Sequence, residues 1–335
     1  MTDQLRLRRP LKRLVAATVC GAAALGMIAA CSDPAPSSPP SVVASTSLST
    51  TDTGAVRRDI PYAGDASPEH RLDLYLPAAE GPTSRGSGPS TTAYPLVLYI
   101  HGGAWTAGDK SVMSGSSDGI GALRDTLVSH GYAVASMNYR LVPAAVFPAQ
   151  IHDVKAAVRF LRAQGPALGV DPRRIGVVGD SAGGHLAELL ALTPGVPALE
   201  GSIGTPPSPG VDSTVRAAVS YYGISDLGAL GEDRRRHGCG AGVDGPTSME
   251  GALLGGIDPT AAGNAPRVRE ASPMSYAGRA RTPLLLFHGT RDCLVPPEQS
   301  RDLHDALTAA GSTSELTEID ADHADPEFFT APALQ

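Results

Sequence analysis

Ser181 has the surroundings that chemistry at a carbonyl group requires. It stands in Gly-Asp-Ser-Ala-Gly-Gly-His, with Gly179 and Gly183 on either side. In a nucleophile elbow, G-x-S-x-G, a strand ends in a tight, strained turn where only glycine-sized neighbours avoid a clash. The turn exposes the serine Oγ and leaves the N–H of Ala182 free at a helix N-terminus, where it can stabilise an oxyanion. The motif predicts a nucleophile that attacks a carbonyl carbon.

The residues around the motif favour an elbow over the alternative, a glycine-rich strand-to-helix turn without chemistry. G-x-S-x-G alone is a weak signal, because glycine and serine are common in loops. Here the apolar run at 175–178 predicts a buried strand before the serine, and residues 182–192 predict a helix after it.

A serine nucleophile needs a histidine to take its proton, and in folds with this elbow the acid and then the histidine follow the serine on loops after late strands. Four histidines lie well beyond the elbow: His237, His288, His304 and His323. Of these, His323 alone follows the last expected strand, whereas the others lie in irregular chain, at a strand end and within a helix. We predict His323 as the base; the alternative is a solvated loop histidine.

Asp292 is the predicted carboxylate partner of that histidine. It follows the expected strand at 284–287, in the sequence His-Gly-Thr-Arg-Asp-Cys. Asp226, after the preceding strand, is the main alternative. A second set of N–H donors for an oxyanion is predicted in Gly102-Gly103-Ala104, because small residues after a strand let the backbone approach a substrate. A plain glycine turn is the alternative there.

The elements that must position these residues alternate between strands and helices. Apolar runs predict strands at 96–100, 133–137, 217–222 and 315–319, and helical spacing predicts helices at 120–130, 151–161 and 298–310. Residues 57–62 and 71–76 alternate as an antiparallel hairpin exposed on one face does, and 226–280 is glycine-rich and irregular. This order predicts an α/β fold with a mostly parallel sheet covered on both faces.

Composition limits the classes of partner. The formal net charge of the chain is −7. Residues 1–30 carry five basic side chains and one acidic side chain, which is a charge of +4. The rest of the chain therefore has a charge of −11. An acidic body without a basic cluster predicts no nucleic-acid binding. No histidine and cysteine spacing fits a metal site, and no glycine loop with lysine fits a phosphate, so we expect neither metal nor cofactor.

The first 31 residues resemble a lipoprotein signal, with a basic start, an apolar stretch and Ile-Ala-Ala-Cys at its end. We expect lipid on Cys31, export, and a membrane contact through that lipid only; an uncleaved anchor or an ordinary signal peptide is the alternative. Residues 32–55, rich in Pro, Ser and Thr, predict a disordered tether, and 56–335 predict the folded domain.

Two cysteines are left for the folded domain, since Cys20 leaves with the signal and Cys31 takes the lipid. In an oxidising compartment Cys239 and Cys293 are expected to form a disulfide; the alternative is two free thiols.

Together these motifs resemble the α/β-hydrolase superfamily, and within it the hormone-sensitive-lipase-like and feruloyl-esterase-type bacterial esterases. The motifs that carry the resemblance are His-Gly-Gly-Ala-Trp from residue 101, Asn-Tyr-Arg-Leu from 138, the elbow sequence, and His-Gly-Thr-Arg-Asp from 288. The resemblance implies a triad of Ser181, Asp292 and His323, and an oxyanion hole at Gly102, Gly103 and Ala182. Two departures are Ala104, where many relatives have glycine, and the sequence Asp-His-Ala-Asp around His323.

The expected activity is hydrolysis of carboxylic esters of small molecules, with a preference for short acyl groups, because Trp105 and Ala104 fill space beside the oxyanion loop and no long apolar lid helix is evident. Residues 226–280 would form a flap or cap. A serine peptidase and a non-catalytic binding protein on the same fold are the alternatives, since a fold does not determine function.

Overall fold

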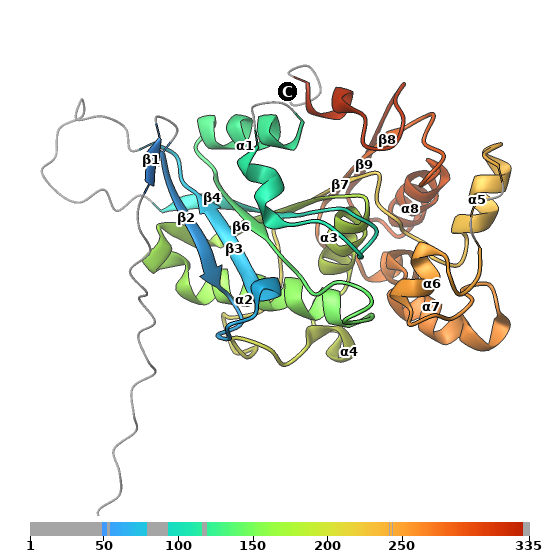
Figure 1. The fold of residues 1–335 in the computed structure, drawn as a ribbon, viewed down its shortest axis with the longest axis horizontal. Helices are drawn as coiled ribbons and strands as arrows, with labels where there is room; N and C mark the ends of the chain where they lie inside the picture. Colours follow the sequence, from blue (N-terminus) through green and yellow to red (C-terminus); the bar gives the residue numbers. More distant parts are fainter. Residues whose placement is uncertain are drawn as a thin grey trace, which may run out of the picture. The chain divides into compact units, whose positions relative to one another are not determined.

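A nine-stranded sheet runs through the part of the chain that the structure describes (Figure 1). The structure is a computed structural model and describes residues 49–51, 54–78, 93–115, 119–240, 242 and 244–330. The strands lie in the order β1-β2-β3-β5-β4-β6-β7-β8-β9. Their bounds are β1 (Ser49–Thr51), β2 (Gly54–Pro61), β3 (Arg71–Tyr75), β4 (Tyr94–Ile100), β5 (Ala133–Met137), β6 (Val170–Asp180), β7 (Ala218–Tyr221), β8 (Leu284–Gly289) and β9 (Ser314–Ile319).

In that order, the six strands from β5 to β9 pair in parallel, and β1, β2 and β3 add an antiparallel edge. The central strands β4 and β5 consist largely of apolar residues that are buried, as strands covered on both faces must be. Because parallel strands end at the same edge of a sheet, the carboxyl ends of β4, β6 and β8 bring the loops after them together. The predicted α/β class with a mostly parallel sheet is confirmed.

Helices cover both faces of the sheet (Figure 1). One apolar cluster joins the sheet to α2, α3 and α8, and a second joins its other face to α1 and the C-terminal turn at 326–329. The helices are α1 (Ile120–Ser129), α2 (Ala149–Leu168), α3 (Ala182–Leu192), α4 (Pro197–Glu200), α5 (Leu230–Arg236), α6 (Met249–Leu253), α7 (Ala265–Ala271) and α8 (Glu298–Ala309).

The sequence predicts that the stretch at 226–280 is irregular, and this prediction is wrong. It forms α5, α6 and α7 and places Leu230, Leu253 and Val268 in the main apolar cluster. Each of these helices has seven residues or fewer, which is too short for an apolar period to show in the sequence. The stretch therefore packs as part of the domain and supplies side chains near the end of β6.

The predicted hairpin forms as β2 and β3, but one of its polar residues, Asp73, is not open to solvent. Asp73 is fully buried and lies 2.8 Å from Lys110 Nζ and 3.1 Å from Arg58 Nη1. The alternation marked Asp73 as outward-facing, because a sequence pattern does not show that a distant lysine and arginine pair with it. A buried carboxylate needs such partners to offset its lost hydration.

The end of the predicted tether belongs to the sheet, since β1 pairs with β2 along its open edge. Of the predicted 32–55 tether, the structure describes only residues 49–51, 54 and 55. The predicted signal segment 1–31, with Cys31, lies outside the described residues. All described residues belong to one compact unit, Thr46–Gln335. Among the described helices, none is both long enough and apolar enough to cross a bilayer.

Candidate active site

Ser181 lies at the turn between the end of β6 and the start of α3. Its backbone has φ 53° and ψ −119°, a conformation that non-glycine residues rarely adopt. Gly179 and Gly183 must be glycines because the turn leaves no room for a side chain. A Cβ on Gly179 would overlap the Gly183 carbonyl, and a Cβ on Gly183 would overlap the Ile100 carbonyl. The sequence therefore folds into the strained elbow that its spacing predicts, with the side chain free to point into a pocket.

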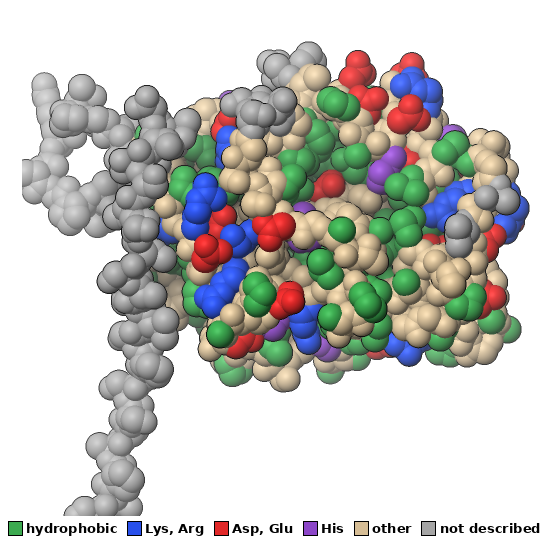
Figure 2. Space-filling model, viewed as in Figure 1, with side chains coloured by type: hydrophobic (Ala, Val, Ile, Leu, Met, Phe, Trp, Pro, Cys, Tyr) green, Lys and Arg blue, Asp and Glu red, His purple; other side chains and the backbone are tan. Residues whose placement is uncertain are grey.

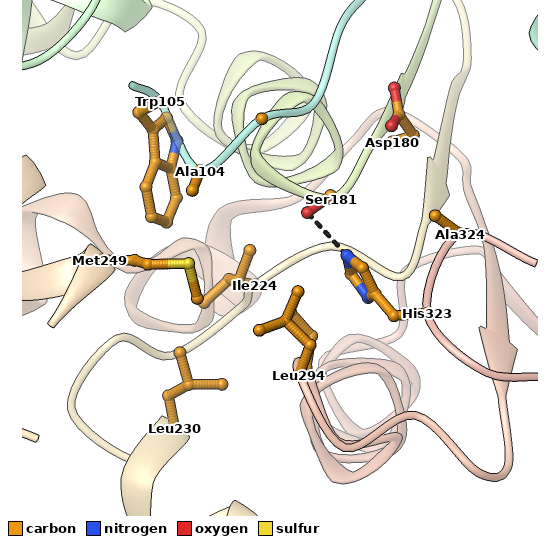
Figure 3. A pocket seen from close by; sticks show the side chains of 12 residues that line it. Ala104, Trp105, Asp180, Ser181, Ile224, Leu230, Met249, Leu294, His323 and Ala324 are labelled. Carbon is orange, nitrogen blue, oxygen red and sulfur yellow. Dashed lines mark hydrogen bonds between the residues drawn. The ribbon is translucent and has the colours of Figure 1, made fainter. Parts of the chain in front are cut away.

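Three residues that are far apart in the chain form one hydrogen-bonded series, of which Figure 3 shows the Ser181–His323 bond. His323 Nε2 lies 3.0 Å from Ser181 Oγ, and His323 Nδ1 lies 2.6 Å from Asp292 Oδ2. When Nδ1 donates its proton to Asp292, the lone pair of Nε2 accepts the hydroxyl proton of Ser181. This arrangement can move a proton from the serine to the histidine while the carboxylate stabilises the resulting positive charge.

Asp292 is fixed and ionised. Its side chain is fully buried, and Oδ1 accepts the N–H groups of Leu294 at 2.9 Å and Val295 at 2.8 Å. Burial acts to raise the pKa of Asp292, but the interactions with His288 and His323 outweigh it and lower the pKa to about 2. The carboxylate therefore keeps its charge at neutral pH.

The other histidines after the elbow have partners away from Ser181. His288 is buried, with Nδ1 2.6 Å from Ser300 Oγ and Nε2 2.7 Å from the Val295 carbonyl. His237 Nε2 lies 3.1 Å from the Thr290 carbonyl, and His304 Nδ1 lies 3.0 Å from Ser314 Oγ. The alternative acid is also engaged elsewhere, because Asp226 Oδ1 accepts the N–H groups of Gly228 and Ala229 and so closes a turn.

The backbone donors near Ser181 differ in one respect from those expected. The Gly102 N–H donates to Asp180 Oδ1 at 3.0 Å, so it is not free for an oxyanion. Gly103 and Ala104 follow it with φ of 106° and 52° and line the same pocket as Ser181. Ala182 is the first residue of α3, where an N–H has no partner within the helix. The available donors are thus Gly103, Ala104 and Ala182.

Asp180, the residue before Ser181, is a polar residue of the site that the sequence did not predict. Besides Gly102, its Oδ1 accepts the Tyr99 hydroxyl at 2.6 Å. Burial raises the pKa of Asp180, although both hydrogen bonds act in the opposite direction. Its position beside the nucleophile at the end of β6 was the available signal, but the Tyr99 partner on β4 could be found only in the fold.

A pocket of about 260 Å³ opens beside Ser181. Apart from the elbow, the oxyanion loop and His323, its walls are apolar (Figure 3). These side chains come from separate parts of the chain: Trp105, Ile224, Leu230, Met249, Leu294 and Val295. No sequence pattern joins them, so only Trp105 was noticed from the sequence.

Trp105 is held firmly in the pocket wall. The side chain is 1% exposed, and its Nε1–H donates to His185 Nδ1 at 3.2 Å. His185 Nε2 in turn lies 2.8 Å from the Ala271 carbonyl, and burial lowers the pKa of His185 to about 4. The neutral imidazole accepts at one nitrogen and donates at the other, which links the oxyanion loop, α3 and α7.

The structure contains the predicted disulfide between Cys239 and Cys293, with a Cα–Cα distance of 5.4 Å. Cys293 stands between Asp292 and Leu294, and Cys239 follows α5, which carries Leu230. The bond therefore connects two of the segments that surround the pocket.

Charges of both signs are mixed on the face shown in Figure 2, where basic side chains form separate groups next to acidic ones. Within the described ranges, no group of three or more His, Cys, Asp or Glu side chains is arranged to hold a metal ion.

Comparisons with known proteins find esterases among the relatives of this chain. The family model BD-FAE matches residues 72–307. The esterase LipC of Mycobacterium tuberculosis is 31% identical over 253 residues, which are 76% of this chain and 55% of that protein. The isoprenylcysteine alpha-carbonyl methylesterase ICME of Arabidopsis thaliana is 31% identical over 270 residues, or 78% of this chain and 54% of that protein. The chain spans about half the length of the curated relatives it matches.

Among solved structures, a truncated carbohydrate esterase from gut microbiota superposes with a TM-score of 0.70 at 30% identity, covering 87% of this chain and 94% of that one. A bifunctional GH43-CE protein of Bacteroides eggerthii superposes with the same TM-score of 0.70, at 32% identity, covering 85% of this chain and 34% of that one. Since the family model covers more than half of the sequence and both structures superpose over most of this chain, the chain has the α/β-hydrolase fold and belongs to the BD-FAE family.

Proposed function

We propose that the protein hydrolyses carboxylic esters through an acyl-enzyme. The observation that carries the proposal is the hydrogen-bonded series of Asp292, His323 and Ser181, in which Ser181 faces a largely apolar pocket. The backbone N–H groups of Gly103, Ala104 and Ala182 lie beside it. The esterase relatives and structural neighbours support the same reaction class.

In the proposed mechanism Ser181 Oγ attacks the ester carbonyl while His323 Nε2 takes its proton. The negative charge that develops on the carbonyl oxygen is stabilised by the N–H groups of Gly103, Ala104 and Ala182. His323 then gives its proton to the departing alcohol, which leaves the acyl group on Ser181. Water attacks this ester with His323 again as base, and the acid and free serine are released.

We propose a preference for short acyl groups. The pocket of about 260 Å³ is bounded by the bulky, buried Trp105 and Leu230. A space of this size suits an acyl chain of roughly two to six carbons rather than a fatty-acyl tail. Faster turnover of twelve-carbon than of four-carbon nitrophenyl esters contradicts this preference.

The reaction is tested with nitrophenyl esters of increasing acyl length beside an aminoacyl nitroanilide. We expect Ser181→Ala to abolish turnover and labelling by a fluorophosphonate, and His323→Ala and Asp292→Asn to slow turnover by orders of magnitude. His304→Ala and Asp226→Asn are matched controls, and we expect both to keep most of the activity.

Each alternative function has its own outcome. Turnover of the nitroanilide in preference to every ester identifies a peptidase. No turnover and no labelling of Ser181 in the folded protein identifies a binding protein on this fold. If a control variant is as damaging as the change it matches, the assignment of that triad member is wrong.

We also propose that the protein is exported and tethered to the outer face of a membrane through lipid on Cys31. The small-residue sequence before Cys31 and the Pro- and Ser-rich stretch after it support this location. Fractionation of wild type and Cys31→Ala tests it: wild type is expected with the membrane and the variant away from it. Equal release of both proteins in soluble form contradicts the proposal.

A further inference from the structure

A second hollow, of about 440 Å³, lies on the sheet face against which α1 packs. Strands β4, β6 and β7 form its floor, and α1 with Tyr132 forms its side. We call it the α1 groove. It has no lining residue in common with the pocket beside Ser181, so it is a separate feature of the molecule.

The floor of the α1 groove is apolar and incompletely covered. Val97 of β4 and Val219 of β7 belong to central strands of the parallel part of the sheet, where both faces are normally covered. Here both are only partly buried, as is Leu127 of α1, although all three pack against the second apolar cluster. The described residues leave the space above them open. An apolar group that entered this space would remove these side chains from water, which is favourable.

Two exposed arginines, Arg174 and Arg216, line the same groove. The Arg216 N–H donates to the Ile175 carbonyl at 2.8 Å, which places the two arginines on adjacent segments. Arg174 Nε lies 2.8 Å from Asp171 Oδ2, so this guanidinium already has a carboxylate partner. The Arg216 guanidinium makes no ion pair and no hydrogen bond with any described residue. The groove therefore has one cation that is available to a ligand.

The chemistry of such a ligand follows from these two properties. A guanidinium binds a carboxylate through two parallel N–H···O bonds, so one available guanidinium matches one carboxylate. The apolar floor beside it matches an alkyl chain. The position of Arg216 on a chain whose residues 31–335 carry a net charge of −11 makes this cation a local exception, and no basic run in the sequence marks it.

The shape of the groove favours a single molecule over a membrane surface. A protein that lies on a bilayer inserts apolar side chains that protrude from it. In the α1 groove Val97 and Val219 form a floor instead, and Tyr132, which is 40% exposed, is the lining residue whose apolar side chain is most open to solvent. An alkyl chain that enters the hollow can cover this floor, whereas a flat lipid surface cannot.

We propose that the α1 groove is a binding site for one fatty-acid anion of medium chain length, with the alkyl chain on the apolar floor and the carboxylate against Arg216. This site goes beyond the proposed ester hydrolysis and does not depend on it, because none of its residues belongs to the proposed triad or to the oxyanion donors.

Titration calorimetry of the full chain with sodium decanoate, below the concentration at which it forms micelles, tests the site. Wild type is expected to bind saturably and to melt at a higher temperature with decanoate, since a ligand of the folded state stabilises it. Arg216→Gln removes the charge and is expected to weaken binding by about tenfold or more. Ala217→Trp fills the groove from an exposed position and is expected to abolish this binding.

Three controls separate the groove from the rest of the molecule. Arg279→Gln removes an exposed arginine that does not line the groove and is expected to keep the affinity of wild type. Met249→Phe narrows the pocket beside Ser181 and is expected to bind decanoate as wild type does. Decanol has the same chain without the charge and is expected to bind about tenfold more weakly or less tightly still. Thermal unfolding of each variant verifies that it is folded.

Several results overturn the inference. Absence of saturable binding, or equal binding by wild type, Arg216→Gln and Ala217→Trp, rules out the site. Loss of binding in Met249→Phe alone places decanoate in the pocket beside Ser181. A dimer of wild type that Ala217→Trp dissociates, seen by sedimentation, identifies a second copy as the occupant.

A membrane surface is distinguished with vesicles of phosphatidylcholine alone and with phosphatidylglycerol added. Binding to the anionic vesicles that depends on Arg216, without binding of free decanoate, identifies a membrane contact and overturns the proposal. None of these measurements uses ester hydrolysis, so a chain that cleaves no ester but binds decanoate at Arg216 contradicts the proposed function and supports this site.

Discussion

Asp180 holds Gly102 in place: its Oδ1 accepts the Gly102 N–H at 3.0 Å and the Tyr99 hydroxyl at 2.6 Å. Asp180 is the residue before the nucleophile, and Gly102 is the residue before Gly103, which carries a free N–H. One carboxylate thus connects the elbow to the oxyanion loop and sets their relative position. A Cβ on Gly102 would meet Asp180 Oδ2 at 2.6 Å, so the two segments are in close contact.

Loss of this connection is expected to slow the chemical step. Asp180→Ala frees the oxyanion loop, and a shift of the donors by a fraction of an ångström is expected to lower kcat by roughly tenfold to a hundredfold with a smaller change in KM. Asp180→Asn keeps an oxygen that accepts both hydrogen bonds and is expected to restore most of the rate. Steady-state kinetics with a butyrate nitrophenyl ester measure both variants.

Tyr99→Phe serves as the control for this prediction, because it removes one partner of Asp180 but keeps the bond to Gly102. We expect it to reduce stability by about 1 kcal/mol and to leave kcat close to that of wild type. Equal losses of kcat in Tyr99→Phe and Asp180→Ala refute a specific role for the Asp180–Gly102 bond.

The disulfide is expected to stabilise the domain. Cys239 and Cys293 are 54 residues apart, and closing a loop of this length contributes about 4 kcal/mol in the chain-entropy model. The double variant Cys239→Ser/Cys293→Ser avoids a free thiol, and urea unfolding compares it with wild type. Alkylation followed by intact-mass measurement shows whether the bond is present: two alkylated cysteines without reduction rule it out.

Glu188 is expected to make stability fall with pH. Its side chain is fully buried on α3, where Oε1 accepts the Ser220 hydroxyl at 2.7 Å and Oε2 has no partner among the described residues. Burial raises the pKa of Glu188 to about 8, against the opposing effect of the Ser220 hydrogen bond. Between about pH 4.5 and 8, Glu188 keeps its proton in the folded protein but releases it in the unfolded chain. The contribution of Glu188 to the free energy of unfolding therefore falls as the pH rises through this range and is constant above about pH 8.

Glu188→Gln removes the titration and keeps an acceptor for Ser220. We expect its melting temperature to match that of wild type near pH 5 and to exceed it by several degrees near pH 8. The difference between the two proteins isolates Glu188, because His185, whose pKa is lowered to about 4, is present in both. Melting curves that stay parallel from pH 5 to 9 contradict the prediction.

The candidate catalytic residues were predictable from the sequence, because each of them follows an apolar run that predicts a strand. An apolar run ended at Ser181, another ended before Asp292, and the last strand ended before His323. The structure brings the three side chains together because parallel strands end at one edge of the sheet.

Contacts between distant segments were not predictable in this way. Lys155 and Arg159 lie on α2, and charged side chains on a helix are mostly solvated, yet both are fully buried against Glu200 of α4. The engagement of Gly102 by Asp180 likewise depends on two strands lying side by side. A single sequence shows the period of a helix or strand, but not which charged side chain meets its partner across the fold.

The division of the site between segments has a consequence for how its selectivity can change. Leu230 and Met249 belong to one continuous stretch, 226–280, that contains no member of the triad and no oxyanion donor. We expect that this stretch can be exchanged as a unit. Replacing it with the corresponding segment of another family member would change one wall of the cavity and leave Ser181, His323 and Asp292 in place. The part of the pocket wall that this stretch supplies is therefore separate in sequence from the proposed reactive residues, whereas Trp105 and Leu294 lie on the same segments as those residues.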